Sequence, residues 1–533
     1  MSRLRKLSIL GLAAVLPFAL PATANASGAL VSADARHDVS APFSQMAAQA
    51  PTNSGGQAQQ ALMAQGTGNS FSSSQPDPVA QPLSTSLTGV TTGLNFEGQT
   101  DNDTLALLGV KYVPPDTNGA AGATQFVQMV NVTIAVYDKT NGKRVLGPAL
   151  ISSLWTGFGG PCEAGNGGDP VVLYDQIAGR WFISQLEYNS NFSSNQECIA
   201  VSKTSDATGR YNRYQFDFGN QLPDYPKFGV WPDAYYSSQN MFQVMGGTFT
   251  FLGARTCALN RANMLIGKDA TQICFQTKVA SLLPSNLDGS TLPPLGSPNF
   301  FVDLADSTHL NLFRFHTDFN NPANATLNGP VSIQVAPFSE LCPFAANRAC
   351  IQEPSPGERL DSLDDRLMFR LAYRNFGDHE SLVVNHTVAS GGGLAGVRWY
   401  EIRNPAGSLP SVVQQGTVVD PATNFWMGSI AMDKAGNAAL GFSATSLKLD
   451  PSVYVVGRAV GDQLGVMSGP LTIVTGTGVQ ESSFNRWGDY SAMSIDPSDD
   501  CTFWYTQEYY KTTGSFNWTT RIASFKFSSC QTL

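Results

Sequence analysis

Five aspartates occupy similar places along the chain, each just before or at the start of a short apolar segment. They are Asp116, Asp169, Asp224, Asp365 and Asp489. Carboxylates gathered in one pocket can perform acid/base catalysis or bind a hard cation, and a pair roughly 5–10 Å apart is enough for glycoside hydrolysis. We therefore take Asp169, Asp224, Asp365 and Asp489 as candidate catalytic residues, on the condition that the fold brings them together.

Basic and aromatic residues lie near these aspartates or near comparable segments. The candidates for binding substrate are Tyr225, Arg366, Trp426, Arg486, Trp487 and Tyr490, and Lys227 is a further nearby cation. Aromatic side chains offer flat faces on which sugar rings can stack. The alternative interpretation is structural, because an aspartate at the start of a strand often accepts backbone N–H groups and holds the preceding loop in place.

Calcium is a separate hypothesis for the segment 116–119, which reads DTNG. Asp116 and Asn118 alternate oxygen ligands next to a glycine, as loops that bind hard cations do. The segment lacks the terminal glutamate that completes a twelve-residue calcium loop. Calcium thus stays an open alternative, with no other cofactor indicated.

The elements that must position these side chains are pairs of short strands joined by tight turns. The pattern is clear at 171–186, 429–442 and 491–505, and looser copies begin at Asp116, Asp224, Phe300 and Asp365. In each copy the first run is small and apolar, and the second is longer and more aromatic. This order is typical of the two inner strands of a propeller blade.

The repeated strand pairs predict an all-β protein that forms a single β-propeller of about seven blades over residues 84–533. Because the innermost strands of a propeller begin around one end of its central channel, we expect the five aspartates to converge there as a polar pocket. Two β-sandwich domains in tandem are the alternative, although sandwiches give no reason for the strand pairs to recur.

The start of the chain has the features of an export signal. Residues 1–26 combine basic Arg3, Arg5 and Lys6 with an apolar run and end in Ala24-Asn25-Ala26. Residues 27–83 are rich in Ala, Gln, Ser, Gly and Pro, which predicts a disordered lead. We expect a secreted or periplasmic protein, since no second apolar stretch is long enough to span a membrane.

The eight cysteines fit an oxidising compartment, because none has the C-x-x-C spacing of a zinc or redox site. Eight cysteines allow many connectivities, and pairing of sequence neighbours is the simplest. It joins Cys162 to Cys198, Cys257 to Cys274, Cys342 to Cys350 and Cys501 to Cys530. A disulfide-stapled propeller is the resulting prediction.

Four long phrases in the chain resemble a family of exported, largely uncharacterised bacterial β-propeller proteins. They are VPPDTNG at 113–119, GDPVVLYD at 168–175, DYPKFGVWPD at 224–233 and RWGDYS at 486–491. The resemblance spans roughly residues 110–530 and implies a propeller fold and export. It implies no catalytic residue, so function has to be argued from the site.

The net charge of −9 disfavours nucleic acid as a partner, because a negative surface repels phosphate backbones. We expect an extracellular glycan or a cell-surface component as the partner. The leading hypothesis is a protein that binds or processes carbohydrate, of glycoside hydrolase or polysaccharide lyase type if it is an enzyme. A non-catalytic adhesin or matrix platform and a metal-dependent hydrolase of another class stay open, as does the oligomeric state.

Overall fold

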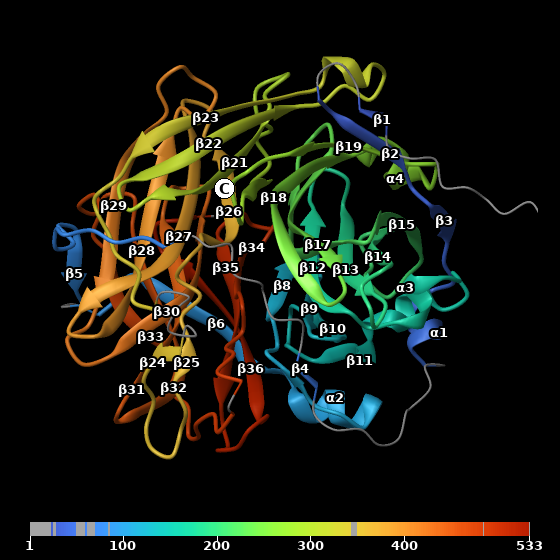
Figure 1. Cartoon of the computed structure of the whole chain (residues 1–533). Helices are drawn as coiled ribbons and strands as arrows, with labels where there is room; N and C mark the ends of the chain where they lie inside the picture. The colour runs from blue at the N-terminus through green and yellow to red at the C-terminus, as the bar shows by residue number, and fades with distance from the viewer. Residues whose placement is uncertain are drawn as a thin grey trace, which may run out of the picture.

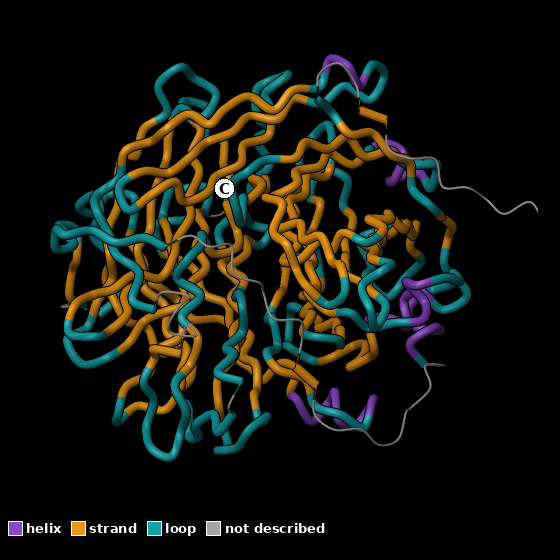
Figure 2. The backbone as a smooth tube through the Cα atoms, in the orientation of Figure 1, coloured by secondary structure: helices purple, strands orange, loops and turns teal. Residues whose placement is uncertain are grey.

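Short strands dominate the structure, and the helices are small and peripheral (Figures 1 and 2). This computed structural model describes residues 23–24, 28–48, 59–60, 70–83, 86–342, 349–482 and 484–531. The described α-helices are α1 (Phe43–Ala47), α2 (Asp101–Leu108), α3 (Pro161–Ala164) and α4 (Arg261–Ile266), and the 3-10 helices are η1 (Ile151–Trp155) and η2 (Pro322–Asn324).

Most strands form four-stranded antiparallel units, numbered here by their order along the chain. Units 1 to 3 are β8–β11 (Asn118–Ala121, Gln125–Val130, Thr133–Asp138, Arg144–Leu150), β12–β15 (Gly168–Asp175, Arg180–Tyr188, Asn195–Ser202, Tyr211–Gly219) and β16–β19 (Gln221–Val230, Tyr235–Met245, Thr248–Leu259, Thr271–Gln276). Units 4 and 5 are β20–β23 (Leu283–Leu287, Asn299–Asp306, His309–His316, Thr326–Gln334) and β26–β29 (Met368–Asn375, Glu380–Gly391, Leu394–Arg403, Ser411–Val419), and parallel pairing of β20 with β26 joins these two units into one sheet. Units 6 and 7 are β30–β33 (Asn424–Met432, Ala438–Ser446, Leu449–Arg458, Ser468–Val474) and β34–β36 (Ala492–Ile495, Thr502–Tyr510, Trp518–Phe527) with β6 (Val90–Thr100).

The first strands of these units form a closed ring. Each contacts the next in the order β8, β12, β16, β20, β26, β30, β34, and β34 contacts β8 again. Within each unit the later strands follow outward from the ring. This arrangement confirms the single all-β propeller, and the pairings support the predicted blade number. We call the end of the ring at which the first strands begin the mouth.

The last unit is completed by a strand from near the start of the chain. Strand β6 pairs antiparallel with β36, from Val90 opposite Phe527 to Thr100 opposite Thr519. Figure 1 shows these two strands side by side, one blue and one red. Because the unit contains both early and late residues, the ring is closed by hydrogen bonds between distant parts of the sequence.

The disordered lead predicted over residues 27–83 is wrong for the parts that the structure describes. Strands β2 (Leu30–Ala33) and β3 (Arg36–Val39) add to β19 and β15, and β5 (Ala80–Pro82) adds in parallel to β29. Phe43 and Met46 are buried in the same apolar cluster as Trp155. Edge strands need mainly backbone hydrogen bonds and a few well-placed apolar side chains, which average composition does not reveal. Two further short strands, β1 (Thr23–Ala24) and β4 (Gln59–Gln60), pair with β2 and with β7 (Tyr112–Val113).

The fourth strand pair predicted from sequence begins one strand too late. Phe300 lies in β21, and the inner strand of unit 4 is β20. Strand β20 is buried although it is polar, because unit 3 and the next strand of its own unit satisfy its polar groups. The backbone N–H of Val230 donates to Asn286 Oδ1 at 2.9 Å, and that of Phe300 donates to Ser285 Oγ at 3.1 Å. A search for strands by hydrophobicity alone misses a polar inner strand of this kind.

The predicted disulfide connectivity is confirmed. Four bonds join Cys162–Cys198, Cys257–Cys274, Cys342–Cys350 and Cys501–Cys530. A small two-stranded sheet, β24 (Ala349–Ile351) with β25 (Leu360–Asp361), follows the third of them. In the described part of the chain, no helix has the length and apolar character needed to cross a membrane. The predicted signal segment 1–26 lies outside the described residues apart from the backbone of Thr23–Ala24.

Candidate active site

Charged side chains from five units meet at the mouth and form what we call the axial cluster. Its members are Asp116, Asp169, Asp224, Tyr225, Lys227, Asp365, Arg366, Arg486, Asp489 and Tyr490. Tyr225 connects several of them. Its backbone N–H donates to Asp169 Oδ2 at 3.1 Å and its hydroxyl donates to the carbonyl oxygen of Asp489 at 3.3 Å. The structure thus brings together the five aspartates singled out in the sequence.

The backbone at the mouth has an unusual conformation that recurs around the ring. A non-glycine residue with positive φ stands at or near the start of each first strand, a conformation that is uncommon and costs roughly 1–3 kcal/mol. These residues are Asp116 (49°), Asp169 (48°), Tyr225 (56°), Ser281 (51°), Leu363 (45°), Met427 (56°) and Asp489 (45°). The pairing register shifts at Asp169, Tyr225 and Met427, as at a β-bulge. Bulges re-aim side chains and are common beside active sites.

Two arginines in the cluster are held by the aspartates next to them. Arg366 donates through Nε and Nη2 to the two oxygens of Asp365 at 2.8 and 3.1 Å. Arg486 uses the same two nitrogens, donating from Nε to Asp489 Oδ1 at 3.2 Å and from Nη2 to Oδ2. Both pairs are buried, so each carboxylate contacts its own guanidinium group at hydrogen-bonding distance.

Lys227 lies between two tyrosine rings in the middle of the cluster. Its Nζ is 3.5 Å from the ring centroid of Tyr225 and 4.0 Å from that of Tyr490. Burial lowers the pKa of Lys227 to about 8, and nearby Asp169 acts in the opposite direction. Lys227 is therefore a cation at neutral pH but is close to releasing its proton.

Burial raises the pKa of three aspartates of the cluster, Asp116, Asp169 and Asp224. Burial raises the pKa of Asp224 to about 8, with a further contribution from the charge of Asp169. Burial also raises the pKa of Asp116 well above its ordinary value, and the charges of Asp489 and Asp169 add to this. Neither oxygen of Asp116 accepts a hydrogen bond, and one buried oxygen of Asp224 has no hydrogen-bond partner. The Asp224 carboxyl therefore holds its proton at neutral pH, while Asp365 and Asp489 pair with arginines.

Two buried glutamates beside the cluster were not identified from the sequence. Glu197 of β14 and Glu508 of β35 are 2% and 0% exposed. Burial raises the pKa of each, and Asp169 and Asp489 respectively contribute through their charges. The sequence feature that could have identified them is an acidic residue inside an otherwise apolar or aromatic strand, in QECIAV at 196–201 and YTQEYY at 505–510.

Several roles predicted from the sequence are not supported by the structure. Trp426 and Trp487 are fully buried and pack against each other with ring centroids 5.4 Å apart, so they offer no face to a sugar. The faces of Tyr225 and Tyr490 are covered by Lys227. These side chains lie in the apolar core between units, where large aromatic residues pack well. They are therefore not available at the surface.

The calcium hypothesis for Asp116 and Asn118 gains no support from their contacts. Asn118 Oδ1 accepts the backbone N–H of Val172 at 3.0 Å, which joins units 1 and 2 and removes this oxygen as a ligand. No group of three or more His, Cys, Asp or Glu side chains in the described ranges is arranged to hold a metal ion. Asp116 belongs instead with the acidic side chains of the axial cluster.

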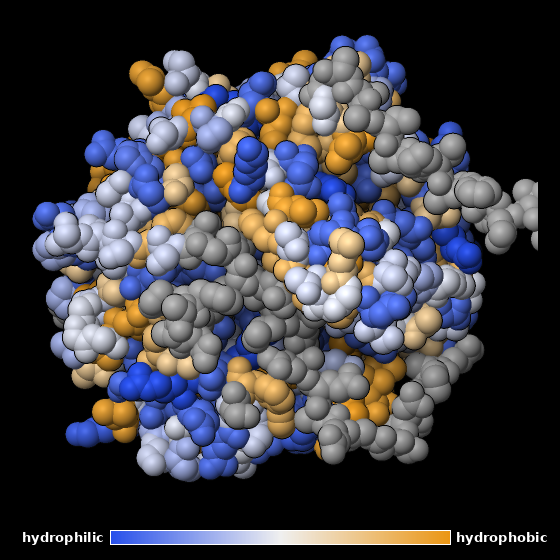
Figure 3. All heavy atoms as spheres, viewed as in Figure 1, coloured by the Kyte–Doolittle hydropathy of each residue, from blue (hydrophilic) through white to orange (hydrophobic). Residues whose placement is uncertain are grey.

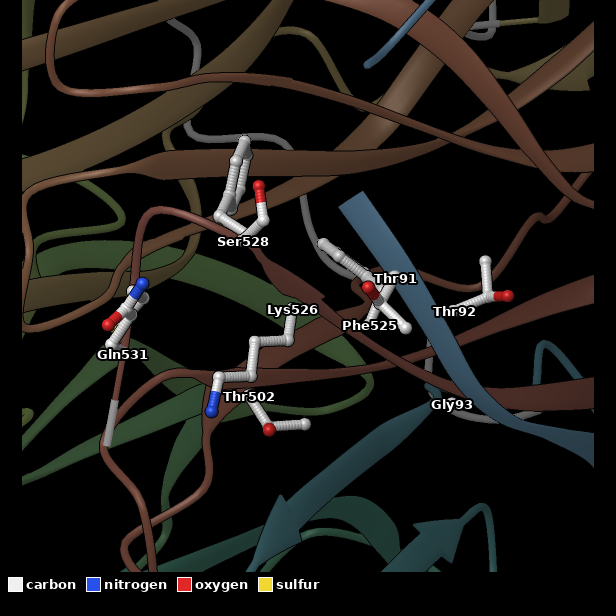
Figure 4. Close-up of a pocket in the computed structure, with 10 residues that line it drawn as sticks. Thr91, Thr92, Gly93, Thr502, Phe525, Lys526, Ser528 and Gln531 are labelled. Atoms are coloured by element: carbon white, nitrogen blue, oxygen red, sulfur yellow. The ribbon is translucent and has the colours of Figure 1, made fainter. Parts of the chain in front are cut away.

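The axial cluster is closed to solvent, whereas the sequence predicted an open polar pocket. Asp365 is the most exposed of the five aspartates at 8%, and Asp116 and Asp224 are each 1% exposed. An open hollow lies elsewhere, at the outer seam between β6 and β36, where Thr91, Thr92 and Lys526 line it (Figure 4). No residue of the axial cluster lines that hollow. A ligand of the cluster therefore has to displace side chains that now fill the mouth.

Comparisons with known proteins leave the function to be argued from this site. Neither a protein family nor a curated protein matches the chain. Among solved structures, an ulvan lyase is similar at 12% identity and a TM-score of 0.33, covering 74% of this chain and 92% of its own. An α-L-arabinanase from Penicillium chrysogenum is similar at 11% identity and a TM-score of 0.32, covering 70% and 100%. A protein of unknown function from Dyadobacter fermentans, at 9% identity and a TM-score of 0.25, covers 67% and 94%. Similarity at this level carries no argument about function.

Proposed function

We propose that this protein is exported and acts on extracellular carbohydrate, cleaving glycosidic bonds by acid/base catalysis in the axial cluster. Asp224 and Asp116 are the candidate proton donors, and Asp169 is the candidate base. The observation that carries the proposal is a difference between neighbouring carboxyl groups: burial raises the pKa of Asp224 to about 8, whereas at Asp169 the charge of Lys227 opposes the rise that burial causes. Carboxyl groups whose surroundings separate their pKa values in this way are the usual source of an acid and a base in one site.

The contacts of the individual aspartates support this more than a purely structural role. A structural aspartate at the start of a strand accepts backbone N–H groups, and Asp169 does so from Tyr225. Asp116 accepts none, and Asp224 has an unpartnered oxygen, although both are buried. Leaving buried polar atoms unpaired costs roughly 1–3 kcal/mol each, so such atoms are more often kept for chemistry or for a ligand than for stability.

A binding platform without catalysis is less well supported. It would need a broad exposed apolar or aromatic patch. On the face seen in Figure 3, hydrophobic residues are scattered among hydrophilic ones. The aromatic residues that we had assigned to the mouth are buried.

The test is an activity screen of the purified full chain against a panel of polysaccharides. Release of reducing ends measures cleavage, and ultraviolet absorbance of unsaturated ends distinguishes elimination from hydrolysis. On a cleaved substrate we expect Asp224→Asn and Asp116→Asn to lower kcat roughly 100- to 10,000-fold, as for loss of a general acid. Unchanged kcat in both variants, or no cleavage across the panel, would refute the proposal.

Asp303→Asn is the matched control for this test. Asp303 is also buried and also has an unpartnered oxygen, but it lies in β21, the second strand of unit 4. The substitution removes the same kind of buried carboxyl group at a place outside the axial cluster, so we expect the activity to be retained. Thermal unfolding of all three variants separates failure to fold from loss of catalysis.

A further inference from the structure

Arg366 and Arg486 share one incomplete pattern of hydrogen bonds. Each uses Nε and Nη2 on its neighbouring aspartate, and each leaves Nη1 without a partner. The two side chains are only 1% and 2% exposed. Arg370, in the first strand of unit 5, shows the contrast, because its Nη1 and Nη2 bind Asp288 and its Nε binds the carbonyl oxygen of Met493. The two arginines of the cluster therefore keep a charged donor that the described residues do not satisfy.

The two unpartnered nitrogens belong to one site. The guanidinium of Arg366 lies 4.7 Å from the ring centroid of Tyr225, and the hydroxyl of that tyrosine donates to the backbone of Asp489, the partner of Arg486. Both guanidinium groups also act electrostatically on the Asp224 carboxyl. The two arginines therefore border the same part of the cluster, around Tyr225 and the Asp224 carboxyl.

The other unpartnered atoms around this place restrict the kind of ligand. Asp224 holds a proton at neutral pH because it is buried, so its O–H group is a donor as well. A metal ion needs acceptors, whereas the unpartnered atoms here are two guanidinium nitrogens and the Asp224 acid group. A planar carboxylate suits it best, since guanidinium groups bind carboxylates with matched geometry.

We propose that Arg366 and Arg486 bind the carboxylate of a uronic acid unit, so that the substrate class is an acidic polysaccharide. This inference rests on the proposed function and names its substrate. The chain as a whole carries a net charge of −9, so long-range attraction does not favour such a ligand. Recognition must come from the two guanidinium groups at short range.

The test is calorimetric titration of the full chain with glucuronate, glucose and the methyl ester of glucuronate. We expect glucuronate to bind roughly tenfold to a hundredfold more tightly than either neutral sugar, as for loss of a hydrogen-bonded charge. This comparison uses the unaltered protein, so it stands even if a variant fails to fold. Equal affinity for the three sugars, or no binding of glucuronate, would overturn the inference.

Variants then locate the carboxylate. Arg366→Lys and Arg486→Lys keep the positive charge but lose the planar guanidinium group, which can donate two parallel hydrogen bonds to a carboxylate. Each substitution should weaken glucuronate binding roughly tenfold or more while leaving the weak affinity for glucose unchanged. Arg370→Lys is the matched control and should have no effect on binding. An equal loss in the control would overturn the assignment.

The outcomes separate this inference from the proposed function. Cleavage of neutral polysaccharides without affinity for glucuronate would leave the catalytic proposal standing and refute the substrate class. Binding of glucuronate without cleavage of any polysaccharide would support the arginine site and refute catalysis.

Discussion

Lys227 is the residue whose removal should cost the most stability in the axial cluster. It is 1% exposed, and burial lowers its pKa to about 8, so at pH 7 it is a buried cation. Lys227→Met keeps the length of the side chain and removes the charge. Asp169 then loses its neighbouring cation, and the rings of Tyr225 and Tyr490 lose the ammonium group that lies 3.5 and 4.0 Å from their centroids.

The expected loss in the free energy of unfolding is about 3–5 kcal/mol, the usual consequence of leaving a buried charge uncompensated. Each cation–π contact adds roughly 0.5–2 kcal/mol, which places the expectation in the upper part of that range. The measurement is denaturant unfolding at pH 7 with the disulfides intact. The double variant Lys227→Met/Asp169→Asn should recover part of the loss, because the uncompensated charge is then gone.

Lys511→Met is the control for this experiment. Lys511 pairs with Glu97 at 2.7 Å, but the two side chains are 58% and 42% exposed, so its loss should cost less than about 1 kcal/mol. If Lys227→Met also costs less than about 1 kcal/mol, or if Asp169→Asn adds a further loss in the double variant, the electrostatic account of the cluster is wrong.

Three further predictions follow from the pKa values, from the packing and from the disulfides. The pKa of Asp224 is about 8 in the folded protein and near its ordinary 3.8 in the unfolded chain, so the folded state binds the extra proton between these values. The melting temperature should therefore fall as pH rises from about 4 to about 8, and Asp224→Asn should flatten that fall; equal slopes would contradict the assignment. Gly229→Ala should cost about 1–3 kcal/mol, because its new methyl group would clash with the carbonyl oxygen of Ser285 in the next unit. Gly461 has open space around it, so Gly461→Ala should leave the urea midpoint unchanged. Equal shifts of the urea midpoint in Gly229→Ala and Gly461→Ala would refute the packing argument. Replacing both cysteines of Cys501–Cys530 by serine should destabilise the protein by about 1 kcal/mol more than the same change at Cys342–Cys350, since the two loops span 29 and 8 residues. Thermal melts of the two double variants test this order, and the reverse order would contradict it.

The position of the site could be predicted from the sequence, but the contacts and burial of its side chains could not. Asp116, Asp169 and Asp489 were found because each precedes or begins a short apolar strand, which is a local pattern. Their contacts were not predictable, since Asp116 lies against Asp169 of the next unit while Asp489 pairs with an arginine three residues away. Glu197 was missed because a single acidic residue within a strand looks like a surface position until the neighbouring unit covers it.

The sequence alone determined the class of fold, and its simplest cysteine pairing is the observed one, because both depend on neighbours in sequence. Alternation of short apolar runs with turns produces antiparallel strand pairs, and the repetition of these pairs favours a ring. Cysteines a few tens of residues apart within one or two adjacent strand pairs find each other without knowledge of the rest of the chain.

Only the tertiary structure decided that polar Leu283–Leu287 is an inner strand, that residues 30–39 complete two outer edges, and that the mouth is closed. It also decided which carboxyl groups hold protons. Burial and electrostatic interaction are sums over residues far apart in the chain, so a protonation state such as that of Asp224 exists only once units 2, 3, 5 and 7 have met around one axis.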